Sequence, residues 1–331
     1  MKHINVALFV PDAGCPHRCS FCNQKTISGK ITPLKVEEID RAVKIALNNI
    51  GCNEGEIAFF GGSFTAIDRD YMVSLLERAY AYVEKGLFKG IRISTRPDCI
   101  NQEILDILHR YGVTAIELGC QSMDDEVLLL NKRGHTEKDV VNAVRLIKTN
   151  GFELGLQMMT GLYGDTDEKA VCTAGKIIAL CPDTVRIYPT IVLEGTDLCQ
   201  LYRKGLYAPQ TVDEAAELCK RLLLMFEEND IKVIRLGLHS GGNVEEGFVA
   251  GPYHPAFREF CESKIYLDNV LNQLQEQSLT AGNIEITVGT SFVSMLTGQK
   301  KANIVKLNKM GFKVKIIQNK EYQKYEVSVR G

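Results

Sequence analysis

Eight residues near the amino terminus, Cys15-Pro16-His17-Arg18-Cys19-Ser20-Phe21-Cys22, place three cysteines at the spacing C-x3-C-x2-C. Three thiolates this close together can wrap one face of a [4Fe–4S] cube and leave one iron without a protein ligand. A zinc knuckle and three unrelated buried thiols are the alternatives. Structural zinc, however, takes four ligands, usually in two pairs, and His17 lies inside the loop itself. The spacing therefore favours an iron–sulfur cluster on Cys15, Cys19 and Cys22.

The cysteine loop directly follows a short apolar run, and similar runs recur along the chain between longer amphipathic segments. This alternation predicts strands spaced by helices and hence a parallel sheet. The predicted strands are 4–10, 57–60, 91–94, 115–119, 154–159, 184–188 and 232–236. The predicted helices are 35–50, 69–85, 101–111, 136–150, 167–180 and 211–229. Periodicity leaves open whether this α/β sheet is a partial or full TIM-like (β/α) barrel or a doubly wound open sheet.

The composition is that of an ordinary globular protein, with 331 residues, 45% hydrophobic, 24% charged and a net charge of −2. These values exclude a disordered chain and a protein that binds polyanions through its overall charge. The longest uncharged stretch, 286–299, is too short to cross a bilayer, and the amino terminus lacks a secretory cleavage pattern. Eleven cysteines without an export signal predict free thiols in a reducing compartment, the cytoplasm, and no membrane partner.

The strand–helix alternation ends near residue 238. Residues 239–256 are rich in Gly and Pro and are predicted to form an ordered loop, followed by a helix over 256–277. The remaining residues predict strand 284–288, helix 292–296, the tetrapeptide Gly-Gln-Lys-Lys, helix 302–309 and strand 313–317. We therefore predict a core of 1–238, a loop and helix of 239–280 that pack on this core, and a small α/β subdomain of 281–331.

The cysteine spacing, with an aromatic residue before Cys22 and on the loop after a first strand, resembles the radical S-adenosylmethionine (SAM) superfamily. The resemblance implies a barrel of the radical SAM type. It also implies a [4Fe–4S] cluster whose open iron is chelated by the amino and carboxyl groups of SAM. Reduction of the cluster, which needs an external electron donor, would then cleave SAM to methionine and a 5′-deoxyadenosyl radical.

Segments at three predicted strand ends carry the same resemblance. Residues 59–65 (FFGGSFT) resemble the glycine motif whose backbone binds the amino end of SAM, with Ser63 where Glu is usual, as in the Elongator-like branch. Residues 94–98 (STRPD) resemble the catalytic subunit of Elongator, and Ser94 would face SAM. The pair 117–122 (ELGCQS) and 131–135 (NKRGH) resembles the Elongator branch and the oxygen-independent coproporphyrinogen oxidases.

In this resemblance Gln121 and Arg133 contact SAM, and the fork of donors on an arginine suits its carboxylate. Residues 157–164 (QMMTGLYG) resemble the adenine-binding segment, with Gln157 facing the nucleoside. The implied SAM contacts are thus Gly61, Gly62, Ser63, Ser94, Gln121, Arg133 and Gln157. The segments that carry them follow predicted strands, at the end of the barrel where enzymes of this architecture place their sites.

Substrate-side candidates come from the sixth predicted strand and the segments after it. They are Tyr188, Glu194, Arg235, His239, Tyr253 and His254. We interpret Tyr188, His239 and His254 as catalytic, since histidine can donate a proton near neutral pH. A packed strand tyrosine and two surface histidines are the alternative interpretation. The surrounding segments 234–240 (IRLGLHS) and 251–257 (GPYHPAF) also resemble the Elongator-like branch.

The carboxyl-terminal stretch is strongly basic. Residues 298–331 contain nine Lys or Arg and two Glu, so the rest of the chain is acidic. Such asymmetry can mark a nucleic-acid contact. The order of elements loosely resembles a KH module, whose GXXG loop clamps a nucleic-acid backbone, but Lys301 replaces the second Gly. A surface for tRNA or other RNA and a solvated basic cap are both consistent with this stretch.

The Elongator catalytic subunit modifies wobble uridines of tRNA with a radical SAM domain and an acetyltransferase domain that binds acetyl-CoA. The resemblance covers residues 1 to about 260, and we expect the remaining residues to leave no room for an acetyltransferase domain. The first hypothesis is therefore a radical SAM enzyme that modifies tRNA or another RNA. The alternatives are a radical SAM enzyme with a porphyrin-like or peptide substrate, and a non-catalytic iron–sulfur protein that binds RNA or chaperones a cofactor.

Overall fold

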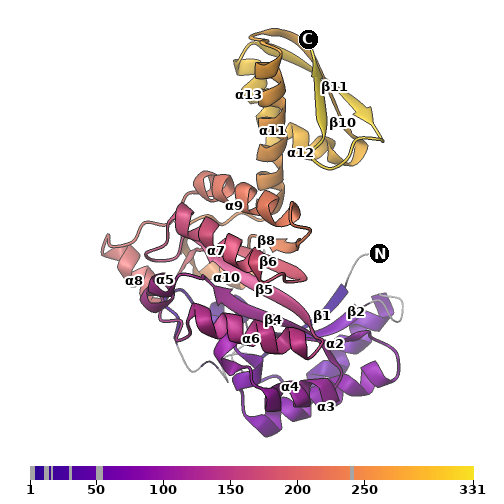
Figure 1. Ribbon diagram of the computed structural model, residues 1–331, viewed down its shortest axis with the longest axis vertical. Coiled ribbons are helices and arrows are strands. Elements are labelled where there is room, and N and C mark those ends of the chain that lie inside the picture. The colour runs from indigo at the N-terminus through magenta and orange to yellow at the C-terminus, as the bar shows by residue number, and fades with distance from the viewer. Residues whose placement is uncertain (1–3, 11–14, 16–17, 30–31, 50–54, 239–241) are drawn as a thin grey trace.

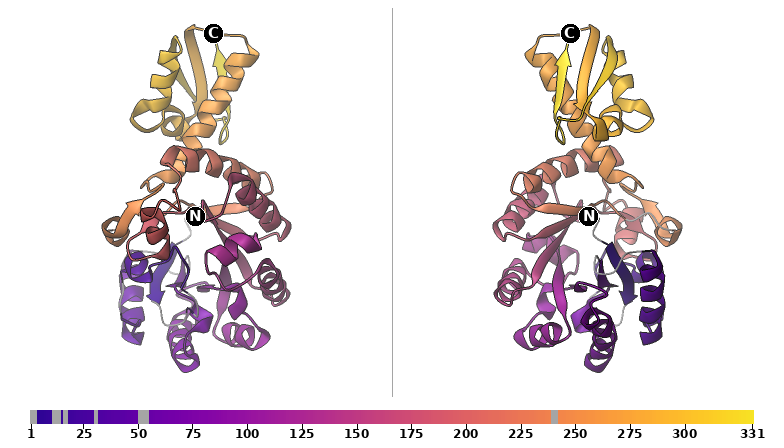
Figure 2. Two further views of the ribbon diagram at one scale, coloured as in Figure 1. Left: turned by 90° about the vertical axis from the view of Figure 1, so that its left-hand side faces the viewer. Right: turned by 90° about the vertical axis from the view of Figure 1, so that its right-hand side faces the viewer.

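The computed structural model describes residues 4–10, 15, 18–29, 32–49, 55–238 and 242–331. Within them, seven parallel strands form one curved sheet in the order β1-β2-β3-β4-β5-β6-β8 (Figure 1). No pairing joins β1 to β8 among these residues, so the sheet is a half-barrel, which Figure 2 shows as an open arc. The strands are β1 (Ile4–Val10), β2 (Gly55–Gly61), β3 (Gly90–Thr95), β4 (Val113–Gln121), β5 (Glu153–Thr160), β6 (Thr184–Pro189) and β8 (Lys232–Leu236).

Helices cover the outer, convex face of this sheet (Figure 2). They are α2 (Val36–Asn49), α3 (Arg69–Glu84), α4 (Gln102–Arg110), α6 (Glu137–Thr149), α7 (Asp167–Ala179) and α9 (Val212–Glu227). Thr136 and Thr211 begin α6 and α9 with capping boxes, in which hydroxyl and acidic side chains satisfy the first free amides. The seven strands and six helices predicted for this region are confirmed to within two residues at either end.

Alternation along the strands separates the hydrophobic core from the interior of the half-barrel. In β3, Ile91 and Ile93 are fully buried against the outer helices, whereas Arg92 and Ser94 point into the interior. Successive side chains of a strand point to opposite faces, so each strand contributes to both regions. The core therefore lies between sheet and helices, and the concave side is left for polar groups.

Several short elements of the barrel region escape the sequence analysis. They are α1 (Gln24–Ser28), α5 (Asp125–Leu130), α8 (Asp197–Arg203), α10 (Gly242–Gly247), β7 (Val192–Leu193), β9 (Phe248–Ala250), and the 3-10 turns Phe64–Ala66 and Pro97–Cys99. The predicted loop over 239–256 is therefore wrong for residues 242–250. Apolar side chains such as Val244 bury against Ile191 and Leu193, and β9 pairs antiparallel with β7. Because the segment is rich in glycine, its sequence alone does not indicate this apolar contact.

The carboxyl-terminal subdomain contains a second, three-stranded sheet with the order β11-β10-β12. Its elements are β10 (Gly282–Gly289), a 3-10 turn (Thr290–Phe292), α12 (Val293–Thr297), a second 3-10 turn (Gln299–Lys301), α13 (Ala302–Lys309), β11 (Phe312–Asn319) and β12 (Val327–Arg330). The two predicted strands and two predicted helices are confirmed. Strand β12 was not predicted, because four residues give too short an alternation, and it pairs antiparallel with β10.

One long helix, α11 (Phe257–Glu276), joins the half-barrel to this subdomain (Figure 1). Its first half packs Cys261 and Ile265 into the core of the half-barrel. Its second half packs Val270 and Leu274 into the core of the subdomain. The domain limits at 238 and 280 stay a prediction. Within the described ranges, no helix combines the length and apolar character needed to span a bilayer.

Candidate functional site

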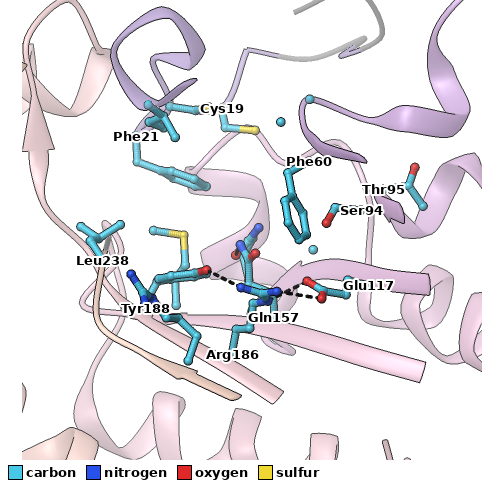
Figure 3. Close-up of a pocket in the computed structure, with 18 of the residues that line it drawn as sticks. Cys19, Phe21, Phe60, Ser94, Thr95, Glu117, Gln157, Arg186, Tyr188 and Leu238 are labelled. Carbon is cyan, nitrogen blue, oxygen red and sulfur yellow. Dashed lines mark hydrogen bonds and ion pairs between the residues drawn. The ribbon is translucent and has the colours of Figure 1, made fainter. Parts of the chain in front are cut away.

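A large cavity of about 1880 Å³ lies on the concave side of the half-barrel. Cys15, Cys19 and Cys22 line it, and so do most of the SAM contacts that the resemblance implies, together with Tyr188 (Figure 3). Those lining residues are Gly61, Gly62, Ser94, Gln121, Arg133 and Gln157. They come from the ends of β2 to β5 and from the loop after β4. Residues as far apart in the sequence as Cys15 and Tyr188, 173 positions, therefore line the same cavity.

The cysteine loop is held in place by Ser20, which lies between the second and third cysteines. Its backbone amide donates to the Asn131 carbonyl oxygen over 3.1 Å, and its hydroxyl donates to the Asn131 side chain over 2.8 Å. On the other side, the Leu198 amide donates to the Ser20 carbonyl oxygen over 2.8 Å. The sequence analysis missed Ser20 and Asn131, because neither residue is itself a ligand type.

Arg133 connects the cysteine loop to the end of β4. One guanidinium nitrogen, Nη1, lies 3.1 Å from Cys19 Sγ, and Nη2 donates to the Gly119 carbonyl oxygen over 2.6 Å. The third nitrogen, Nε, is buried and has no acceptor among the described residues. Arg96 in turn donates to the Arg133 carbonyl oxygen and forms two hydrogen bonds to Asp98. A buried cation with a spare donor beside three thiols suits an anionic group.

Burial and mutual proximity both disfavour ionised thiols at this site. Desolvation raises the pKa of Cys15, and a neighbouring Cys19 thiolate raises it further, while Arg96 and Arg133 lower it. Desolvation likewise raises the pKa of Cys22 to about 12. In the described residues, no three His, Cys, Asp or Glu side chains gather closely enough to hold one metal ion. Three cysteine thiols are a donor set suited to a cubane, whose cysteines bind separate irons.

The glycine segment at the end of β2 lies against the start of the cysteine loop. Gly61 has φ +117°, and a Cβ there would come within 2.6 Å of the Val10 carbonyl oxygen, so only glycine fits. Gly62 donates its amide to the same oxygen over 3.2 Å. Ser63 is buried: its backbone amide bonds the Cys15 thiol, and its hydroxyl bonds Thr95 over 2.9 Å. Ser63 thus supports the cysteine loop without lining the cavity.

Gln121 and Gln157 contact each other in the lining of the cavity. The Gln157 amide nitrogen donates to the Gln121 side-chain oxygen over 3.1 Å. Gln121 has φ +66° and follows an irregularity in the pairing of β4 with β5. A bulge of this kind turns a side chain away from its regular alternation. The irregularity brings Gln121 beside Gln157, which sequence spacing alone does not indicate.

Charged side chains from five neighbouring strands form a largely buried network. Arg92 pairs with Glu56 over 2.8 Å, with Glu153 over 2.8 Å and with Glu117 over 3.5 Å. Glu117 also accepts a hydrogen bond from Arg186 Nη2 over 2.8 Å and forms an ion pair with Arg186 Nε over 2.7 Å, and the Arg186 guanidinium lies over the Phe60 ring (Figure 3). The sequence analysis missed this network. A charged residue in the centre of a predicted strand was the available signal.

Comparison with known families now decides the assignment. Residues 10–174 match the radical SAM superfamily, and residues 182–266 match the C-terminal domain family that accompanies it. The chain belongs to the radical SAM superfamily. It is therefore an enzyme, as the resemblance implied.

The relatives of this radical SAM enzyme include proteins named for tRNA modification. It is 31% identical over 186 residues to the tRNA uridine(34) acetyltransferase of Methanocaldococcus jannaschii, covering 50% of this chain and 34% of that protein. It is 32% identical over 202 residues to human Elongator complex protein 3, covering 54% and 37% respectively. The chain thus spans about a third of the length of each. The solved Methanocaldococcus infernus Elp3 has the same fold, with a TM-score of 0.63, 20% identity, and coverage of 84% and 63%.

The predicted substrate-side residues of the radical SAM enzyme are only partly brought together. Tyr188 and Arg235 line the cavity, and the Tyr188 hydroxyl accepts from Arg186 over 3.5 Å. His254 does not line it: its Nδ1 accepts from the Ala256 amide, and its ring stacks on Phe260. Outside the cavity lining, Glu194 pairs with Arg203, and the Tyr253 hydroxyl donates to Glu245. His239 lies outside the described residues, as does His17.

Proposed function

We propose that this radical SAM enzyme holds a [4Fe–4S] cluster on Cys15, Cys19 and Cys22, binds SAM in the cavity and modifies a nucleoside of tRNA. The observation that carries the proposal is the placement of Arg133. Its side chain touches Cys19, anchors on the end of β4 and keeps Nε buried without an acceptor. A buried unpaired donor is costly, and an anionic ligand in the cavity would remove that cost.

The residues at the cavity mouth suit the parts of SAM. The three cysteines leave one iron of a cube open for the amino and carboxyl groups. Backbone at Gly61 and Gly62 can approach the amino end closely, because no Cβ intervenes. The free donor of Arg133 suits the carboxylate, while Ser94, Gln121 and Gln157 offer hydrogen bonds to the nucleoside. Ser63 supports this arrangement from behind by bonding the Cys15 thiol and Thr95.

With the cluster and SAM both bound, one electron from an external donor would allow them to supply a carbon-centred radical able to abstract hydrogen from a substrate. The chain contributes confinement. Phe21, Phe60 and Leu238 present apolar surface to the cavity (Figure 3), which limits access of water to a reactive species. Tyr188 also faces this space and is the proposed proton donor that the structure best supports. Roles for His239 and His254 stay predictions.

Two considerations support tRNA as the substrate. Small-molecule pockets usually measure about 300–1,000 Å³, and this cavity of about 1880 Å³ has room for SAM together with a second large group. The relatives named tRNA uridine(34) acetyltransferase indicate which class of molecule to test first. The nucleoside that reacts, and the group added to it, are left to experiment.

The test is anaerobic reconstitution with iron and sulfide, followed by reduction and addition of SAM, with and without a tRNA mixture. We expect a [4Fe–4S] absorption spectrum and formation of 5′-deoxyadenosine by the wild-type protein. The C15A/C19A/C22A variant should give neither. Cys172→Ala, Cys181→Ala and their double variant are matched controls, since both thiols are exposed and distant in sequence from the loop, and they should keep both signals.

Absence of the cluster spectrum from the wild type would overturn the proposal. A normal spectrum without 5′-deoxyadenosine, even with tRNA present, would overturn the catalytic part and leave a non-catalytic iron–sulfur protein. If 5′-deoxyadenosine forms but nucleoside analysis of the tRNA by mass spectrometry shows no change in any nucleoside, tRNA is wrong as the substrate. A porphyrin or a peptide would then be the next class to test.

A further inference from the structure

A long run of the carboxyl-terminal subdomain contains no acidic residue. From Ile286 to Lys320 the chain has thirty-five residues, seven lysines and neither Asp nor Glu. Lys315 lies within this run but is paired with Glu285 over 2.6 Å. The other six are exposed, and no ion pair is found for them among the described residues. We call these six the lysine edge: Lys300, Lys301, Lys306, Lys309, Lys313 and Lys320.

The lysine edge follows one continuous piece of structure. Lys300 and Lys301 occupy the turn between α12 and α13, and both have left-handed backbone conformations with φ of 50° and 59°. Lys306 and Lys309 lie on α13, and Lys313 lies on β11, which begins only two residues after α13 ends. β11 is an edge strand of its sheet and packs beside α13. The turn, the helix and the edge strand therefore present positive charge together.

The size of the lysine edge suits a nucleic-acid strand. From Lys301 to Lys309 the chain rises by about 12 Å along α13, at about 1.5 Å per residue. One strand of a duplex carries a phosphate about every 3.4 Å along the axis. The length of this helix therefore matches the span of about three to four phosphates on one strand. The turn that holds Lys300 and Lys301 also lies between two helices, where KH modules place the loop that clamps a nucleic-acid backbone.

The subdomain that bears the lysine edge is tied to the wall of the cavity. Lys324, in the turn before β12, pairs with Glu227 over 2.6 Å and with Glu262 over 3.3 Å. Both carboxylates also pair with Arg258, and Arg258 donates to the Val233 carbonyl oxygen of β8 over 2.6 Å. Arg258 itself lines the cavity. An RNA held by the subdomain is thus held at a set position relative to β8.

We propose that the lysine edge binds the phosphate backbone of the substrate tRNA without reading its sequence, and so positions the RNA at the half-barrel. This inference rests on the proposed function for the identity of the RNA. Charge complementarity carries it: a segment of thirty-five residues with seven lysines and no Asp or Glu, on a chain whose remaining residues carry a net negative charge, attracts a polyanion. Phosphate contacts of this kind set register and orientation, while the base is selected elsewhere, here in the cavity.

The experiment measures tRNA affinity of the full-length protein by fluorescence anisotropy at several salt concentrations. The test variant is K300A/K301A/K306A. The matched control is K44A/K85A/K138A, which removes the same charge from exposed lysines on helices α2 and α6 and at the end of α3. We expect the test variant to bind tRNA at least about tenfold more weakly near 0.1 M salt. The slope of log K against log salt should fall by about two to three.

Three other outcomes would overturn the inference. Equal weakening in both variants would mean that overall charge, and not the lysine edge, attracts RNA, and would overturn the inference. Unchanged binding by the test variant would overturn it as well. Loss of binding to phosphatidylserine vesicles, with no tRNA binding by any protein, would assign the surface to a membrane instead. Formation of 5′-deoxyadenosine without tRNA should be the same in all three proteins, so failure of that assay bears on the proposed function alone.

Discussion

At the scale of single residues, Arg133 joins the cysteine loop to the sheet. Its side chain contacts Cys19 and the Gly119 carbonyl oxygen at the end of β4, and its Nε is buried without an acceptor among the described residues. A lysine would keep the positive charge but lose the planar set of donors, because an ammonium group cannot donate hydrogen bonds in three fixed directions within one plane. In the proposed function, Arg133 would hold a fixed position between the cluster and SAM.

Replacement of Arg133 by lysine tests this view. We expect the reconstituted Arg133→Lys variant to keep the cluster spectrum but to bind SAM about ten- to a hundredfold more weakly, because a hydrogen bond to a charged group contributes about 1.5–3 kcal/mol. Equilibrium dialysis with labelled SAM measures the affinity. Arg110→Lys, an exposed residue at the end of α4, is the control and should bind SAM normally. An unchanged affinity in Arg133→Lys would contradict the assigned contact.

A second prediction concerns His135, which is buried two residues after Arg133. Burial, and then the charge of Arg133, lower its pKa from 6.5 to about 4. The native state thus binds fewer protons than the unfolded state between these values, and stability falls as the pH drops from about 6.5 towards 4. Between pH 7 and pH 5 the depressed pKa of His135 should lower the free energy of unfolding by about 2 kcal/mol. It should contribute no pH dependence above about pH 7.

Urea unfolding at pH 7 and pH 5 measures this difference. His135→Gln should lose the part of the pH dependence that comes from the histidine, although it will be less stable at pH 7 because the bond to the Cys120 carbonyl oxygen changes. His109→Gln, at an exposed position of α4, should behave like the wild type. The assignment fails if the pH 7 to pH 5 difference is the same in all three proteins.

At the scale of elements, the cysteine loop depends on the short helices α5 and α8. Asn131 ends α5 and bonds three segments: it accepts from the Ser20 hydroxyl and donates to the carbonyl oxygens of Val127 and Tyr163 over 2.8 and 2.9 Å. The Leu198 amide of α8 completes the support from the other side. These hydrogen bonds hold a loop that has three cysteines and little regular structure of its own.

Asn131→Ala should therefore weaken both the fold and the cluster site. Loss of three buried hydrogen bonds is expected to lower the free energy of unfolding by about 2–4 kcal/mol. It should also speed the loss of iron to a chelator. Ser20→Ala removes only one of these bonds and should cost about 0.5–1.5 kcal/mol. Urea unfolding and the decay of the cluster absorbance give the two quantities. Equal effects of the two variants would show that Asn131 has no additional supporting role.

At the scale of the whole molecule, α11 links two hydrophobic cores along one helix. Cys261 and Ile265 belong to the half-barrel, and Val270 and Leu274 belong to the subdomain. Tyr325 packs against both cores and adds a second link. The chain thus contains the half-barrel with its large cavity and the lysine-rich subdomain, and the ion pairs of Lys324 lie between them.

Because the two hydrophobic cores are separate, we expect the half-barrel and the subdomain to unfold independently. Leu274→Ala should destabilise the subdomain by about 2–5 kcal/mol, the usual cost of such a cavity. Hydrogen exchange should then quicken in β10 but not in β4. Leu222→Ala, equally buried on α9 in the core of the half-barrel, should show the reverse pattern. If both variants quicken exchange in both strands alike, the chain unfolds as one cooperative unit.

The regular elements were predictable because their signals are local. Alternation around Ile91 and Ile93 identifies a strand, and the capping residues Thr136 and Thr211 lie where α6 and α9 were expected to start. The short elements were not predictable, because their stability comes from contacts elsewhere. Helix α10 and strand β9 exist through burial against Ile191 and Leu193, which are about fifty residues earlier in the chain.

The sequence by itself determined the family, the parallel βα order and the three cysteines, because each depends on residue type and spacing over short distances. Only the tertiary structure decided that the sheet stays open as a half-barrel, that Gln121 meets Gln157 across a bulge and that Arg92, Glu117 and Arg186 pair inside the lumen. It also decided that His254 lies away from the cavity that Tyr188 lines. These facts depend on how distant strands curve and register against one another, which no local pattern encodes.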